Sequence, residues 1–216
     1  PGISSVWPTK QPRIFQTVGP QAVLTAWSSA AYDEESKTLY CMGGGGTDYG
    51  GNEVYSFSLE DGAWRRLTEP SPLDHVNRGD RRVRIPDTRL VPAASHLHDG
   101  LLFNPRTRTL VLLAHEAATG ARLRKEDPDP GEPFMIDGGI RPQQYEFNPD
   151  VWETRNGLAP LTWRRIGTEP WRHPRSEVLP DGTLLLGSKT SLHRARIGIT
   201  GELLVGNTVL DHGDYG

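Results

Sequence analysis

The stretch YCMGGGGTDYGGNEVYSFSLEDGAWRRL, residues 40–67, decides how the whole chain is interpreted. Its glycine-rich part follows a short apolar run and precedes a segment in which apolar and polar residues alternate. One interpretation is a loop that cradles phosphate, but a P-loop requires Lys-Ser or Lys-Thr after its glycines, and none follows here. A dinucleotide-binding loop requires a helix after its glycines. The alternation with a period of two predicts a strand instead.

Four strands are predicted around this stretch, over residues 26–32, 38–42, 52–59 and 63–67. The polar segments DEESK and EDG between them are turn signals. Short strands that are joined by tight turns form an antiparallel sheet. The stretch therefore predicts one four-stranded sheet in which the glycines follow the second strand.

Composition and charge narrow the class of protein. The chain has 216 residues, which suits one domain, and it is rich in glycine and proline, as is typical of short strands and many turns. Its net charge of −3 comes from interspersed charges of both signs, so we expect no nucleic-acid partner. No apolar run reaches the roughly 18 residues of a transmembrane helix, so we expect no membrane insertion. The single cysteine, Cys41, excludes an internal disulfide and is expected in the core.

The four-strand pattern repeats along the chain. The segment HDGLLFNPRTRTLVLLAH, residues 98–115, matches WSSAAYDEESKTLYCMGG, and TWRRIGTEP, residues 162–170, matches AWRRLTEPSP. A third unit begins with SEVLPDGTLLLGS, residues 176–188, and continues with SLHRARI and GELLVGNTVL. Each second strand begins with Thr-Leu, at Thr38, Thr109 and Thr183. Such a repeat predicts three consecutive antiparallel sheets.

These units divide the chain into predicted segments. Residues 1–25 form an N-terminal extension or a closing strand, for which PRIFQTVGPQ is the candidate. Residues 26–72 form the first unit, 73–93 a connecting loop, and 94–170 the second unit with a long insertion at 116–143. Residues 171–216 form the third unit and the start of a further one.

The first unit resembles the kelch repeat of β-propellers. The residues that carry the resemblance are Gly43 and Gly44 at the end of the second strand, Tyr55 in the third and Trp64 in the fourth. The chain is similar in this respect to the kelch-type domain of galactose oxidase and to bacterial and phage kelch proteins of unassigned function. The resemblance implies an all-β fold, a propeller or part of one, whose blades stack face to face.

The later units keep fewer of these marks. The second keeps Tyr145 and Trp163 but has Ala114 and His115 in place of the glycine pair, and the third keeps only Gly187. A propeller has about 4–8 blades, so three blades leave sheet faces and edges uncovered. We expect the chain to be part of a larger propeller; the alternative is a ring that is completed by self-association with other chains.

The resemblance also predicts where a binding surface lies. In a propeller, the second-to-third connections and the connections between blades emerge on one face, and the remaining turns emerge on the other. The long segments 43–51, 68–93 and 116–143 all belong to the first class, whereas the second class is short apart from 150–161. Long loops on a rigid scaffold commonly carry binding sites, although they also serve to cover a core. The predicted ligand-binding residues are Asp48, Tyr49, Asn52, Glu53, Arg78, Asp80, Arg81 and Arg82.

Other motifs are less specific. The RGD triplet at residues 78–80 lies among interleaved charges and is typical of a solvated loop more than of an adhesion motif. His96 and His98 share one face of a strand, as two metal ligands do, but hydrogen-bonded histidines are the commoner explanation. The acidic segment EDPDPGEP lacks the spacing of a calcium loop. No catalytic residue, metal ligand or cofactor is therefore assigned.

The function predicted from the sequence is a non-enzymatic recognition module that binds protein or glycan through the long-loop face. It would belong to a larger chain or to an extracellular or virion-type assembly. One alternative is a galactose oxidase-like or glycan-active enzyme whose catalytic residues lie partly outside this chain, since no copper-ligand set carries over. The other is a purely structural component of an assembly.

Overall fold

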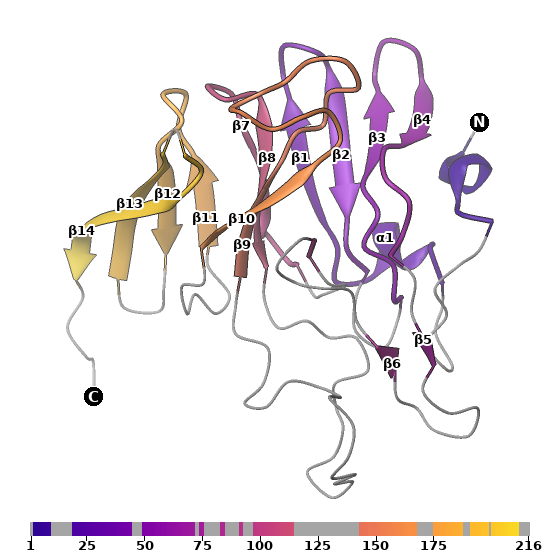
Figure 1. The fold of residues 1–216 in the computed structure, drawn as a ribbon, viewed down its shortest axis with the longest axis horizontal. Helices are drawn as coiled ribbons and strands as arrows, with labels where there is room; N and C mark the ends of the chain where they lie inside the picture. The colour runs from indigo at the N-terminus through magenta and orange to yellow at the C-terminus, as the bar shows by residue number, and fades with distance from the viewer. Residues whose placement is uncertain are drawn as a thin grey trace, which may run out of the picture.

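The structure is a computed structural model of the chain. It describes residues 2–9, 19–44, 49–71, 74–75, 83–84, 91–92, 97–114, 143–167, 175–187, 191–198 and 200–211. Within these residues, strands form three four-stranded antiparallel sheets and one two-stranded ribbon (Figure 1). The predicted all-β class and the three four-stranded sheets are confirmed, and none of the sheets in the described segments closes on itself.

The first sheet has its strands in chain order. They are β1 (Ser29–Asp33), β2 (Thr38–Met42), β3 (Tyr55–Ser58) and β4 (Ala63–Arg66). The second strand has the predicted bounds, whereas the third begins three residues later than predicted because its ladder with β2 starts where Tyr55 pairs with Cys41.

The second and third sheets repeat this order. The second consists of β7 (Leu101–Asn104), β8 (Thr109–Ala114), β9 (Gln143–Phe147) and β10 (Trp163–Gly167). The third consists of β11 (Arg175–Val178), β12 (Leu184–Gly187), β13 (Ser191–Ile197) and β14 (Leu203–Asp211). The pairing of β10 with β9 shifts register at Arg165, as in a β-bulge.

Small elements surround the sheets. A 3-10 turn η1 (Ile3–Val6) and a single helical turn α1 (Ala22–Thr25) precede the first sheet. Strands β5 (Asp74–His75) and β6 (Val83–Arg84) pair within the connecting loop. In the described segments, no helix is long and apolar enough to cross a membrane. The proposed closing strand PRIFQTVGPQ falls mostly outside the described residues.

The repeat has a conformational basis in the turn between the first two strands of each sheet. The residue before each Thr-Leu pair is left-handed, with φ of 50° at Lys37, 57° at Arg108 and 81° at Gly182. A left-handed residue at this point completes a tight turn. Nonglycine residues rarely adopt this conformation, so its recurrence at Lys37 and Arg108 marks a shared turn of four residues, between Asp33 and Thr38 and between Asn104 and Thr109. The third turn keeps the left-handed residue as a glycine but is one residue shorter, between Leu179 and Thr183.

A polar side chain supports each of these turns. The Asp33 carboxylate accepts a hydrogen bond from the Glu35 backbone N–H at 3.1 Å, and Asn104 Oδ1 accepts one from the Arg106 N–H at 3.1 Å. The Asp181 carboxylate accepts one from the Thr183 N–H at 2.9 Å. Asp and Asn favour turns because their side chains satisfy backbone donors two residues further on.

The core lies between stacked sheets. Tyr40 and Met42 of the first sheet meet Leu112 and Phe147 of the second in one buried cluster. A second cluster joins the second and third sheets through side chains of β8, β10, β12 and β13. A third packs η1 and α1 against the outer face of the first sheet. The first strands of neighbouring sheets also touch, since β1 contacts β7 and β7 contacts β11.

This stacking separates the connections into two sets. The turns β1–β2, β3–β4, β7–β8, β9–β10, β11–β12 and β13–β14 lie together at the upper end of the sheets in Figure 1. This end of the sheets is the short-turn face.

Candidate functional site

The residues predicted to bind a ligand fall into two groups. Asp48, Arg78, Asp80, Arg81 and Arg82 lie outside the described residues, so their place on the long-loop face stays a prediction. The remaining three, Tyr49, Asn52 and Glu53, are described, and they are buried instead of exposed on a surface.

Tyr49, Asn52 and Glu53 are 0%, 6% and 1% exposed. The phenol hydroxyls of Tyr49 and Tyr55 both donate to Glu53 Oε1, at 2.5 and 2.7 Å. Asn52 donates through Nδ2 to the Pro92 carbonyl at 2.7 Å. These side chains anchor the end of the glycine-rich loop to the first sheet, and they present no surface to a partner.

The Glu53 carboxylate is an unusual buried acid. Among the described residues, its Oε2 atom has no hydrogen-bond partner. Desolvation raises the pKa of Glu53 above its ordinary value, although the hydrogen bonds from Tyr49 and Tyr55 and the charge of Arg66 oppose the rise. A side chain at Gly51 would overlap this carboxylate and the Tyr49 ring, so only glycine fits there.

An open cavity lies where the first strands of the three sheets meet, on the short-turn face. It has a volume of about 680 Å³. Its lining comes from β1, β7, β11 and the turns that follow them: Ala30, Ala31, Tyr32, Asp33, Glu34, Glu35, Leu101, Leu102, Phe103, Pro105, Arg108, Glu177, Val178 and Pro180. Sequence reasoning missed this cavity because no single unit of the repeat forms it.

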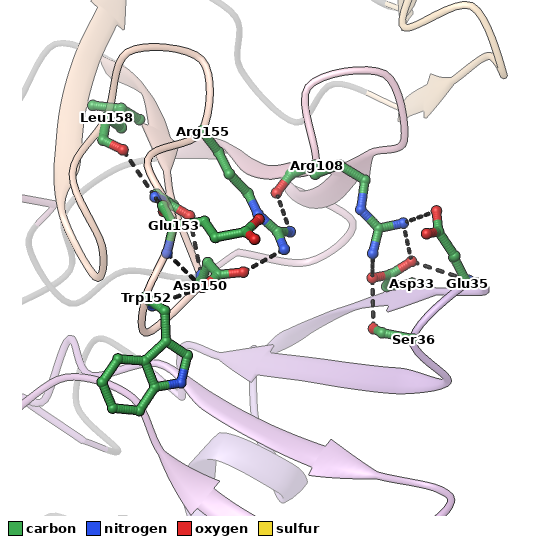
Figure 2. A network of polar contacts seen from close by, with 10 residues as sticks. Asp33, Glu35, Ser36, Arg108, Asp150, Trp152, Glu153, Arg155 and Leu158 are labelled. Carbon is green, nitrogen blue, oxygen red and sulfur yellow. Dashed lines mark hydrogen bonds and ion pairs between the residues drawn. The ribbon is translucent and has the colours of Figure 1, made fainter.

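Ion pairs across two sheets build one rim of the cavity (Figure 2). Arg108, in the β7–β8 turn, contacts Asp33 Oδ2 at 2.7 Å, at the end of β1, and Glu35 Oε2 at 2.5 Å, in the β1–β2 turn. Ser36 Oγ donates to the same Asp33 oxygen at 2.6 Å. The Asp33 side chain is 2% exposed, so this pair is shielded from solvent more than an ordinary surface salt bridge.

The loop between β9 and β10 continues this network. Arg155 donates to the Arg108 carbonyl at 3.2 Å and forms an ion pair with Asp150. Buried Asn148 donates through Nδ2 to the carbonyls of Glu153 and Leu158, at 2.7 and 2.8 Å. The loop is therefore fixed at both ends by its own side chains and tied to the second sheet.

Asp150 fixes the tip of this loop. Its Oδ1 accepts the backbone N–H groups of Trp152 at 2.7 Å and Glu153 at 2.9 Å. Desolvation opposes ionisation of Asp150, but these two donors and the charge of Arg155 outweigh it and lower the pKa of the carboxyl. At neutral pH the carboxylate is ionised and holds the tip in one conformation.

Trp152 is the most exposed large apolar side chain of this face. It is 87% exposed, and its neighbour Val151 is 48% exposed. Figure 2 shows the indole ring directed away from the ion pairs of the loop. Tyr32, near the end of β1, and Leu59, in the β3–β4 turn, are 44% and 53% exposed. The sequence analysis noted the long connection at 150–161 but gave Trp152 no role.

A second open cavity of about 610 Å³ lies beside α1 and extends to His98, Asp99 and Ser176. Cys41 lies on its wall, and burial raises the pKa of the thiol to about 11, so the thiolate is scarce at neutral pH. Within the described segments, no group of three His, Cys, Asp or Glu side chains is placed to hold a metal ion. His96, the proposed partner of His98, lies outside those segments.

Comparison with known proteins adds no family assignment. No protein-family model matches the chain, and no curated protein is significantly similar to it.

Proposed function

We propose that the chain forms three consecutive blades of a kelch-like β-propeller and acts as a recognition module for a protein or a glycan. The strand order supports the blades, because the first strands of successive blades adjoin in a propeller, and β1, β7 and β11 adjoin here. The aromatic pairs also repeat: the ring centroids of Phe57 and Trp64 lie 5.0 Å apart, and those of Phe147 and Trp163 lie 4.6 Å apart. Further blades, of this or another chain, would complete the ring.

The main support for a recognition function is the cavity between the first strands of the three sheets. It combines apolar walls with a few charged groups that converge from three sheets, which is typical of a ligand-binding site. Tyr32 is its exposed aromatic side chain, and aromatic rings stack on both sugars and peptide side chains. The long-loop face is a second candidate surface for the same function.

Binding measurements with one substitution in the cavity test this function. Wild-type protein, Tyr32→Ala and Leu204→Ala are each titrated with a panel of oligosaccharides and peptides. Leu204 is a matched control because it is 54% exposed and lies on β14, away from the cavity lining. We expect at least one ligand to bind Tyr32→Ala roughly ten-fold more weakly than the other two proteins. If every ligand binds all three proteins equally, or none binds, the cavity is not a recognition site.

A further inference from the structure

The short-turn face has a charge that differs from the rest of the chain. Its six turns hold eight acidic and four basic residues, a net charge of −4, while the whole chain has −3, so the remaining residues carry +1. The acidic residues are Glu34, Glu35, Glu60, Asp61, Asp150, Glu153, Asp181 and Glu202, and the basic ones are Lys37, Arg106, Arg108 and Arg155. All of these acidic side chains except that of Asp150 are exposed.

The positive charges of this face are partly neutralised already. Arg108 is paired with Asp33 and Glu35, and Arg155 is paired with Asp150. Two arginines of adjoining strands, Arg65 and Arg196, lie 3.5 Å from the carboxylates of Asp61 and Asp181, which are exposed surface pairs. The exposed carboxylates are spread over the turns of all three sheets. They create a field that attracts cations across the whole face instead of one compact ion site.

Trp152 adds a fixed aromatic contact to this field. Its loop is held by Asn148, Asp150 and Arg155, so the ring is presented with little ordering cost when a partner binds. A guanidinium or ammonium group binds well over a tryptophan face, and the exposed Glu153 carboxylate follows it in the chain. Tryptophan is also among the residues that most often dominate the binding energy of an interface.

From these observations we infer that the short-turn face docks an arginine- or lysine-rich segment of another protein, with Trp152 as its central contact. This inference rests on the proposed recognition function and specifies its partner. Charge complementarity decides the occupant, because a neutral glycan gains nothing from the field and a nucleic acid is repelled by it. The exposed Trp152 ring distinguishes this surface from an acidic face that is only solvated.

The test uses a short peptide of alternating arginine and glycine, end-blocked and fluorescently labelled. Its controls are the glutamate–glycine counterpart and a neutral oligosaccharide. Each is titrated into wild-type protein, Trp152→Ala, Leu204→Ala and the triple variant Glu34→Gln, Glu60→Gln, Glu153→Gln. All of these substituted side chains are exposed, so thermal unfolding of the variants should match wild type.

We expect the arginine peptide alone to bind, and salt to weaken it. Trp152→Ala should weaken binding roughly ten-fold, equivalent to about 1.4 kcal/mol, while Leu204→Ala leaves it unchanged. The triple variant should bind more weakly and with less dependence on salt. Equal binding of the arginine peptide by wild type and Trp152→Ala would show a non-specific polycation effect and overturn the inference.

The remaining outcomes separate this inference from the proposed function. If the oligosaccharide binds in a Tyr32-dependent manner and the arginine peptide does not, the inference fails while the recognition function stands. If neither probe binds and the wider panel also gives no Tyr32-dependent ligand, both fail.

Discussion

Strands β4 and β10 carry the same Trp-Arg-Arg sequence in corresponding places of two sheets, but the central arginine has a different environment in each. Arg65 is 66% exposed, and it lies 3.5 Å from Asp61, which is 60% exposed. Arg164 is 22% exposed and forms an ion pair with Glu146, which is fully buried. One arginine thus belongs to the solvated surface and the other to the interior.

The cross-strand partner and the next sheet explain this difference. Arg65 pairs across the ladder with Ser56, whereas Arg164 pairs with Glu146. The β13–β14 turn of the third sheet covers Arg164, because a side chain at Gly201 would overlap its guanidinium group. The repeat therefore specifies the strand, while the neighbouring sheet determines which ion pair the arginine needs.

Removing the buried acid should have the largest effect. Glu146→Ala leaves Arg164 covered by the third sheet without its counter-ion and removes the acceptor of Thr109 Oγ1 and Asn156 Nδ2. We expect the free energy of unfolding to fall by about 3–5 kcal/mol, as for other broken buried ion pairs. Urea denaturation measures the loss. Ser56→Ala, at the corresponding place opposite Arg65, is the matched control. Equal losses of stability in the two variants would show that the buried ion pair of Arg164 is not the cause.

Removing the ion pair between the first and second sheets should lower the stability less than removing Glu146. Arg108→Ala removes the cation from Asp33, which keeps its hydrogen bonds from the Glu35 N–H and Ser36 Oγ. We expect a loss of about 1.5–3 kcal/mol, the usual range for a hydrogen bond to a charged group. Arg106→Ala, two residues away and exposed, should change the stability little. A loss of the same size in both variants would show that the turn matters and the ion pair does not.

A second buried glutamate, Glu53, should make the stability of the fold depend on pH. Glu53 has two tyrosine donors in place of the arginine of Glu146, and desolvation raises its pKa above 4.5. The protonated acid therefore stabilises the fold fully below the unfolded pKa, and this contribution is lost as pH rises through the folded pKa. Glu53→Gln keeps an oxygen acceptor for both phenols and remains neutral.

We therefore expect the stability of Glu53→Gln, relative to wild type, to rise as the pH is raised above about 4.5. Denaturant titrations of both proteins at several pH values give this difference directly. A difference that stays constant with pH would mean that the Glu53 carboxyl has an ordinary pKa in the folded protein.

The strands and turns of this fold could be predicted from the sequence, because they depend on local patterns. The Thr-Leu pairs at Thr38, Thr109 and Thr183 mark the second strands, and the turn residues before them recur for the same conformational reason. Glu53 was predicted on a binding surface because the long segments were expected to lie together on one face. Its burial depends on how the glycine-rich loop folds back onto Tyr55, which no local pattern encodes.

The candidate site on the short-turn face was harder to predict for a similar reason. The cavity needs β1, β7 and β11 side by side, and these strands are distant in sequence. The exposure of Trp152 depends on the conformation of a loop that Asn148 and Asp150 fix through their own hydrogen bonds. Tryptophan in a repeat of strands otherwise predicts a core position, as Trp64 and Trp163 show.

Breaking the exposed ion pair of Asp61 and Arg65 should have the smallest effect on stability. Asp61→Ala removes the carboxylate 3.5 Å from Arg65, but both side chains are mostly in water, and the arginine is fully hydrated without its partner. We expect a change in unfolding free energy below about 1 kcal/mol. A double-mutant cycle of Asp61→Ala with Arg65→Ala isolates the coupling, and added salt should reduce it further. The same cycle with Glu146→Ala and Arg164→Ala should give a coupling several times larger and little affected by salt. If the two couplings were equal, burial by the third sheet would not be the cause of the difference between the two arginines.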